Sequence, residues 1–249
     1  MANGRELQVA RGQIQGEDSF NRQGICPNVD GEFHDVWSYE KQSLVYQTEP
    51  NPLVFVSDSD EDWIGGQGAR LIFLQGIDEN FDEVEETIVP TGESPVQSVN
   101  SYIRLLRAVV IQTGVYGGSN IGNITVYPLG KPGEPQGQIV AGTCRTTGAH
   151  YSTDRHTTAY LQGIEISGFE KDEFLVDFYL RTNYDRVVEP FGADILIDSY
   201  HVRNGFFSRT LRYPLRIAPL RDMIFKARGK KKDSGSLVVA YQLLTVLEG

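Results

Sequence analysis

The chain has 249 residues, of which 22% are charged, and its formal net charge is −10 at pH 7. This length is enough for one large or two small domains with a sizeable core. Phosphate groups repel an acidic surface, so the overall charge argues against direct binding to nucleic acid.

The charges are distributed unevenly along the chain. Residues 17–86 hold 17 acidic and three basic side chains, whereas residues 201–232 hold ten basic side chains and one acidic one. Such asymmetry can orient subunits toward one another or toward a charged partner. The same uneven distribution of charge would also arise if these side chains simply lie on solvated strand faces and loops.

Residues 1–35 are polar, and their apolar side chains are too sparse to form a core. We therefore expect an extended N-terminal arm, which is either disordered or ordered by lying on a neighbour. First short strands are expected at Val36–Tyr39 and Ser43–Tyr46. Asn51-Pro52 then indicates a turn.

Residues 36–128 read as an N-terminal β domain, because short apolar runs alternate with turn signals about every 8–12 residues. The expected strands are Val54–Val56, Ala69–Leu74, Glu85–Val89, Tyr102–Ile111 and Asn123–Val126. The expected turns are Gly76–Asn80, Thr91-Gly92 and Gly117–Asn120. No helical period of comparable strength competes with this pattern.

Residues 138–249 read as a C-terminal β-sandwich domain. The preceding segment 128–137 is rich in Pro and Gly and indicates a boundary or a long loop. Expected strands are Ile139–Thr143, Thr158–Ile166, Glu173–Arg181, Asp194–Val202, Phe206–Tyr213, Asp222–Arg228 and Leu237–Leu247. Leu237–Leu247 is apolar on both faces, so it should be a central strand or lie in a subunit interface.

These patterns together predict an all-β protein. It consists of antiparallel β-sandwich or jelly-roll-like domains with an extended N-terminal arm. The N-terminal sequence has no apolar segment typical of a secretory signal, and no apolar run is long enough for a membrane helix. Cys26 and Cys144 are expected to be buried free thiols, although the sequence leaves a disulfide between them open.

No residue pattern predicts a catalytic, cofactor or metal site. Asp58–Asp62 has the alternating carboxylates of a Ca²⁺ loop, but an EF-hand would need Gly and Glu where Trp63 and Ala69 stand. We expect a solvated acidic loop there, with an irregular Ca²⁺ site as the alternative. Turn chemistry explains Asp78–Glu83 in the same way.

Other candidate groups are equally weak. The spacing of His150, Asp154 and His156 matches no structural zinc pattern. A Ser-His-Asp triad assembles in space and is not excluded by spacing, but the segment around Ser119 lacks the glycine that a nucleophile elbow requires. Arg228–Lys232 could touch nucleic acid, but it reads more simply as a solvated hairpin tip. We therefore expect a protein that is not an enzyme and has no cofactor.

Several short motifs resemble a family of bacteriophage virion structural proteins. They are Gly66–Arg70, Gly76–Asn80, Glu86-Thr87, Thr91-Gly92, Pro95-Val96, Tyr102–Arg104 and Asn120–Ile124. Further motifs that resemble this family occur upstream and downstream, at Ala10–Gly12, Pro27–Asp30, Asp35–Trp37, Thr158–Leu161 and Phe178–Arg181. The chain departs from the family at the acidic segment Asp58–Asp62, where Ser and Thr are usual, and at Thr91-Gly92, where Asn-Gly is usual.

The resemblance implies a place in a virion, made in the host bacterial cytoplasm. Its most specific implication is a homotrimeric decoration or cement protein that bridges major capsid subunits, without membrane or direct nucleic-acid contact. A tail, neck or head-fibre component is the alternative within this class. Outside this class, one alternative is a cellular β-sandwich domain that binds a small ligand. Another is a carbohydrate-active or carbohydrate-binding β protein such as a receptor-binding module, which would need exposed aromatic side chains beside carboxylates. The candidates are Trp37, Trp63, Tyr116 and Tyr151.

Overall fold

The computed structural model describes residues 8–39, 43–168, 173–185, 192–203, 205–230 and 235–248. It confirms an all-β protein whose strands pair antiparallel in three sheets. The chain forms two compact units, of which unit 1 comprises residues 1–41 and 148–249 and unit 2 comprises residues 42–147. This division differs from an arm followed by two consecutive domains, because the whole of unit 2 is inserted within the sequence of unit 1.

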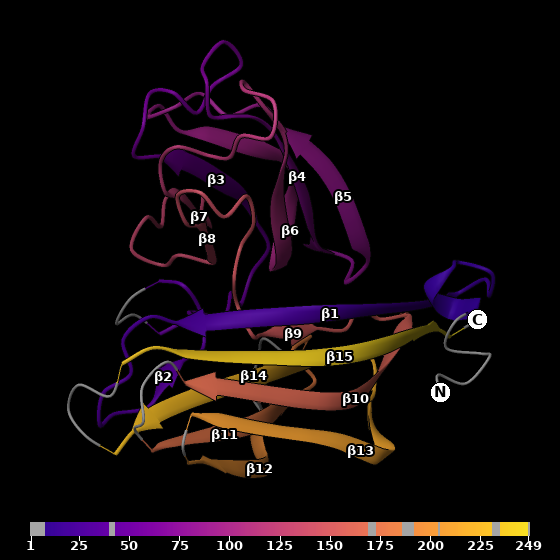
Figure 1. Cartoon of the computed structure of the whole chain (residues 1–249). Coiled ribbons are helices and arrows are strands. Elements are labelled where there is room, and N and C mark those ends of the chain that lie inside the picture. The colour runs from indigo at the N-terminus through magenta and orange to yellow at the C-terminus, as the bar shows by residue number, and fades with distance from the viewer. Residues whose placement is uncertain are drawn as a thin grey trace. The chain divides into compact units, whose positions relative to one another are not determined.

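The described residues of unit 1 form nine strands. They are β1 (Glu17–Cys26), β2 (His34–Asp35), β9 (Tyr151–Ser152), β10 (Thr157–Gly168), β11 (Phe174–Thr182), β12 (Asp194–Val202), β13 (Phe206–Ile217), β14 (Arg221–Gly229) and β15 (Leu237–Leu247). One sheet has the order β1-β15-β10-β13, and the other has the order β12-β11-β14-β2 with β9 also on β14 (Figure 1). If β9 is set aside, the remaining eight strands form sheets of order 1-8-3-6 and 5-4-7-2. This is the two-sheet winding of a jelly roll.

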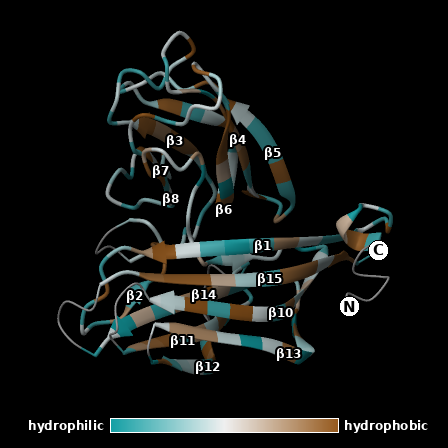
Figure 2. Cartoon of the chain, in the orientation of Figure 1, coloured by the Kyte–Doolittle hydropathy of each residue, from teal (hydrophilic) through white to brown (hydrophobic). Residues whose placement is uncertain are grey.

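Aromatic rings connect the two sheets of unit 1. The Tyr241 ring on β15 stacks on Phe225 of β14 at 5.4 Å, and Phe225 stacks on Phe178 of β11 at 4.8 Å. Alternate residues of β11, Phe174, Val176 and Phe178, are buried in this core, as expected for a strand with one face inward. β15 lies between β1 and β10, which confirms its expected central position. Figure 2 shows the matching hydropathy, with β15 hydrophobic along most of its length and β10 alternating.

Part of the expected arm belongs to the sandwich. Residues 17–26 form β1, which pairs with β15 from Glu17↔Val246 to Cys26↔Leu237. The segment looked too polar for a core because it is an edge strand, stabilised by its backbone ladder as well as by side-chain burial. Residues 8–10 are helical, and residues 1–7 lie outside the described residues.

Unit 2 is a single six-stranded sheet of order β5-β4-β6-β3-β7-β8. Its strands are β3 (Asn51–Ser57), β4 (Ala69–Asp78), β5 (Glu83–Ile88), β6 (Val96–Thr113), β7 (Ile124–Pro128) and β8 (Gly137–Ile139). The long β6 pairs with β3 through its first part and with β4 through its second part. The segment 144–146 bridges β8 and β6, so the sheet curls around its own core. The segment 128–137 is a loop inside unit 2, between β7 and β8.

Three local expectations for unit 2 are wrong. Gly76 lies inside β4, under the Tyr102 ring, and the turn follows at 79–82 with Phe81 at a φ of 63°. Asn51-Pro52 begins β3 instead of a turn, in a position where a strand tolerates proline. Ser43–Tyr46 forms no strand.

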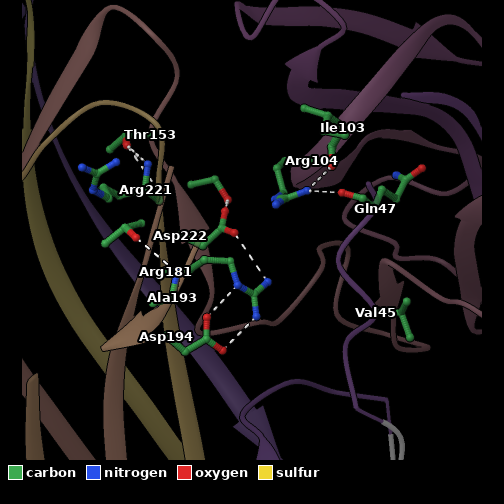
Figure 3. A network of polar contacts seen from close by, with 12 residues as sticks. Val45, Gln47, Ile103, Arg104, Thr153, Arg181, Ala193, Asp194, Arg221 and Asp222 are labelled. Atoms are coloured by element: carbon green, nitrogen blue, oxygen red, sulfur yellow. Dashed lines mark hydrogen bonds and ion pairs between the residues drawn. The ribbon is translucent and has the colours of Figure 1, made fainter. Parts of the chain in front are cut away.

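Side chains hold the irregular segment 43–47 in place of a strand ladder. Arg104 is buried, and its Nη1 donates to the carbonyl oxygens of Gln47 and Ile103, both at 2.8 Å (Figure 3). Gln136 donates to the carbonyl oxygen of Val45 at 2.6 Å. These donors satisfy backbone groups that a strand would have paired.

Two buried tyrosines give a testable contrast. The Tyr102 hydroxyl donates to Glu86 Oε1 at 2.8 Å, whereas the Tyr241 hydroxyl is buried and has no hydrogen-bond partner among the described residues. Burial raises the pKa of both phenols, and at Tyr102 the carboxylate of Glu86 adds to this shift. We expect Tyr102→Phe to lower the free energy of unfolding by about 1–3 kcal/mol, and Tyr241→Phe to leave it unchanged or raise it by up to about 1 kcal/mol.

The same contrast has a pH dependence. A phenol whose pKa is higher in the folded than in the unfolded state stabilises the fold fully below the unfolded value, and this stabilisation is lost as the pH rises above about 10. Urea unfolding of the wild type between pH 8 and 11 should therefore show falling stability. The fall should be shallower in Tyr241→Phe, and an equally steep fall in both proteins would contradict this assignment.

Candidate functional site: the Asp62 loop cluster

Three loops at one end of the unit 2 sheet meet at one carboxylate. They are residues 58–68 between β3 and β4, residues 89–95 between β5 and β6, and residues 114–123 between β6 and β7. We call them the Asp62 loop cluster. The motifs around Gly68 and Gly122, which carry part of the family resemblance, lie at its centre.

Asp62 is fully buried and accepts four hydrogen bonds. Its Oδ1 accepts from the backbone N–H groups of Ala69 at 2.7 Å and Ile121 at 2.9 Å. Its Oδ2 accepts from the Ser57 hydroxyl at 2.7 Å and from the Gly122 N–H at 2.8 Å. Its backbone carbonyl accepts from the Gly92 N–H at 2.7 Å, so this one residue connects all three loops.

Glycine is required where the loops approach this carboxylate. A Cβ at Gly68 would lie 2.1 Å from Asp62 Oδ1, and a Cβ at Gly122 would lie 2.4 Å from the Ser57 hydroxyl oxygen. Both distances are shorter than any side chain tolerates, which explains why the sequence carries glycine at both positions.

Two further polar side chains fix the same loops. The Asp58 carboxylate accepts from the backbone N–H of Asn123 at 2.7 Å and from its side-chain amide at 2.9 Å. Asn120 is buried, and its amide nitrogen donates to the carbonyl oxygens of Gly122 and Val140 at 2.7 and 3.0 Å. The cluster is therefore a hydrogen-bonded platform.

The acidic run 58–62 is a solvated loop only in part. Asp58 and Asp60 are exposed, as expected, but the expectation is wrong for Asp62. Four donors occupy the acceptor positions that an ionised carboxylate offers, so Asp62 has none left for a cation. Among the described residues, no group of three or more His, Cys, Asp or Glu side chains could hold a metal ion.

The platform presents apolar side chains outward. Tyr116 is fully exposed, and Trp63 is 46% exposed while its ring lies against Gly65 and Gly66. Other exposed apolar residues of the cluster are Ile64, Val89, Val115 and Ile121. Ordered loops that display aromatic rings at the surface are typical of recognition sites.

The other candidate residues from the sequence analysis do not lie in the Asp62 loop cluster. Trp37 and Tyr151 are buried in unit 1. In the same unit Asp154 accepts from the backbone N–H of His156 at 2.6 Å, which is a turn contact and not an acid–imidazole pair. The two cysteines form no disulfide bond; Cys26 in unit 1 is buried as expected, whereas Cys144 in unit 2 is only half-buried.

The described residues of the basic segment 228–232 contact neighbouring side chains of unit 1. Arg228 lies over the ring of Phe33 at 4.7 Å, and Lys230 forms an ion pair with Glu173 at 2.9 Å that lowers the pKa of this carboxyl. Lys231 and Lys232 lie outside the described residues. No helix in the described part of the chain is long and apolar enough to cross a membrane.

The loop cluster could not be predicted directly from the sequence. Asp62 stands in a run of acidic residues that all look alike, and its donors come from positions up to 60 residues away. The available signals were the glycines at 68 and 122.

Comparisons with known proteins establish no family. No protein-family description matches the chain, and no curated protein matches it. Solved structures of infectious bursal disease virus show weak similarity. Its T13 particle matches with a TM-score of 0.27 and 9% identity over 94% of this chain and 68% of the viral chain. Its VP2 subviral particle matches with a TM-score of 0.22 and 10% identity over 94% and 71%. Similarity at this level to viral capsid proteins establishes no homology, and we draw no functional argument from it.

We expect Asp62→Asn to lower the free energy of unfolding by roughly 3 kcal/mol, because the amide nitrogen would face N–H donors and leave them unpaired. Asp60→Asn in the same exposed run is the matched control and should change stability by less than about 0.5 kcal/mol. Urea unfolding measures the difference, and hydrogen exchange should show faster exchange of the amides of residues 69, 121 and 122 only in Asp62→Asn. Equal stability of the two variants would refute the central role of Asp62.

Proposed function

We propose that this chain is a structural protein of a bacteriophage virion. On the head its role is that of a decoration or cement protein, which is the most specific role that the residue-level resemblance implies. It acts as a homotrimer that bridges major capsid subunits without catalysis. The observation that carries the proposal is the jelly-roll winding of unit 1 with a complete second β unit inserted into it. Jelly rolls are used in viral capsid proteins, as well as in lectins and cupins.

Fold alone does not select among these uses. Two features favour a shell protein over a small-molecule enzyme. The short motifs resemble virion proteins, and most of the exposed apolar side chains lie in loops or on the edge strands β12 and β13. Surfaces of this kind suit contacts between large neighbours.

Cryo-electron microscopy of the assembled particle tests the location. Density for this chain at regular positions across the head lattice would support the decoration role. A few copies at one vertex would instead assign it to the tail, neck or a head fibre. Absence of the chain from purified particles, checked by mass spectrometry, would refute the virion role altogether.

Carbohydrate or receptor binding is a second candidate function, favoured by one observation. Tyr116 and Trp63 are exposed on the ordered Asp62 loop cluster, and the same cluster carries the exposed Asp60. Aromatic faces stack on apolar ligand faces, and nearby carboxylates accept hydrogen bonds from hydroxyl groups. Of the four aromatic residues considered from the sequence, only these two meet the requirement.

A glycan array of bacterial surface polysaccharides tests this second function. Specific binding by the wild type should be lost in Tyr116→Ala and Trp63→Ala, while exposed Tyr213→Ala in unit 1 should bind normally. Because Tyr116 is fully exposed, its replacement should not affect folding. An array without specific signals, or equal binding by all variants, would reject this function.

A further inference from the structure

One edge of the unit 1 sandwich exposes an unusual set of side chains. β12 and β13 are the last strands of their sheets, and they lie next to each other. The Tyr200 and Phe207 rings are 5.2 Å apart, and Arg209 forms an ion pair with Asp198 at 2.8 Å. We call the exposed part of these two strands the open edge. Its members are Ile195, Leu196, Ile197, Arg212 and Tyr213.

Three consecutive aliphatic residues are exposed on β12. Side chains alternate between the two faces of a strand, so a strand of a two-layer sandwich normally buries every second one. Here Ile195, Leu196 and Ile197 are 49%, 52% and 39% exposed. The pairing of β12 with β11 shifts by one residue at Ile197, which changes the direction of the side chains at this point.

This end of β12 is held in place. Asp194 accepts two hydrogen bonds from Arg181, from Nε at 2.7 Å and from Nη2 at 3.0 Å (Figure 3). Arg181 Nη1 also lies 3.8 Å from the buried Asp222. The exposed aliphatic residues therefore extend from an anchored strand, and their exposure does not result from a frayed end.

The segment that contains β12 and β13, and with them the open edge, has the composition of a protein interface. Residues 194–217 include four Arg, two Tyr and two Phe, but no Lys and no Glu. Interfaces are enriched in Arg and aromatic residues and depleted of Lys and Glu, whereas solvent-exposed edges are usually protected by Lys. The pairing of β13 with β10 is also interrupted between Leu215 and Thr210. This bulge breaks the regular backbone ladder, so docking here would use side chains.

A complementary surface exists on unit 2. Unit 2 has 13 acidic and five basic residues, a net charge of −8. β5 is the last strand of its sheet, and Glu83 and Glu85 are exposed on it with the half-buried Val84 between them. Val84 packs against the core of unit 2, so β5 presents the carboxylates of Glu83 and Glu85 outward. An acidic strand edge complements an arginine-bearing edge.

We propose that the open edge of unit 1 docks the β5 edge of a second copy of this chain. The contact uses two different surfaces, so it is heterologous, and repetition around a closed symmetry axis gives a ring such as a trimer. This contact would explain how the proposed homotrimer forms, and its biological role rests on the proposed function. The contact itself is a property of the purified chain.

Charge reversal on the two surfaces tests the proposal. Sedimentation velocity over a concentration series should show self-association of the wild type. Arg212→Glu and Glu85→Lys should each raise the dissociation constant by about tenfold or more, because each brings like charges together. An equimolar mixture of the two variants should recover association, since each contact between different variants joins opposite charges. A closed trimer has an odd number of contacts and would keep one like-charge contact, so recovery should be partial if the ring is a trimer.

Aliphatic replacements supply the matched control. Leu196→Asp should abolish association, whereas Leu129→Asp, which changes an aliphatic residue that is 48% exposed in the loop between β7 and β8, should not. Thermal unfolding followed by circular dichroism checks that both variants fold. A monomeric wild type, or association that survives Glu85→Lys, would overturn the proposal. A monomeric chain that still occupies the head lattice would overturn this contact alone and leave the virion role standing.

Discussion

The architecture depends on the point where the chain leaves the sandwich and returns to it. Trp37 and Gly148 form a β-bridge there, and the Ala149 N–H donates to the carbonyl oxygen of Val36 at 2.8 Å. β2 and β9 pair antiparallel with successive parts of β14, at residues 226–227 and 222–223. Together they occupy the position of one edge strand of unit 1, and unit 2 is inserted between them. Insertion at closely spaced chain positions lets each unit keep its own core. Gly24 of β1 completes the junction, because a Cβ there would lie 2.2 Å from the Ala149 nitrogen.

Strand positions could be predicted where side chains reveal them. Asp194–Val202 and Leu237–Leu247 have the predicted bounds, because aliphatic residues and turn signals mark both ends. β9 has only two residues, too few for a pattern, and β1 carries mixed polar side chains. Strand order was beyond sequence reasoning, because β1 pairs with β15 more than 200 residues later and no local signal records that choice.

The loop cluster shows a different limit. Turn-forming residues predicted loops at the right places, but the chemistry that connects them is not local. A carboxylate in an acidic run has the same sequence pattern whether water or four protein donors surround it. Only the fold brings Ser57, Ala69 and Gly122 to Asp62. The two surfaces that we propose for recognition thus rest on ordered supports, which are the Asp62 hydrogen bonds in one unit and the Arg181 ion pair in the other.

The central position of β15 bears on how the protein is synthesised. Because β15 lies between β1 and β10, one sheet of the sandwich has no continuous ladder until residues 237–247 have left the ribosome. Unit 2 is contiguous in sequence and is complete once residue 147 is available. Long-range strand pairing forms slowly, and domains made early tend to fold first. The inserted unit can therefore be native while β1 and β2 still wait for their partners, which exposes their edges for most of the time that translation takes.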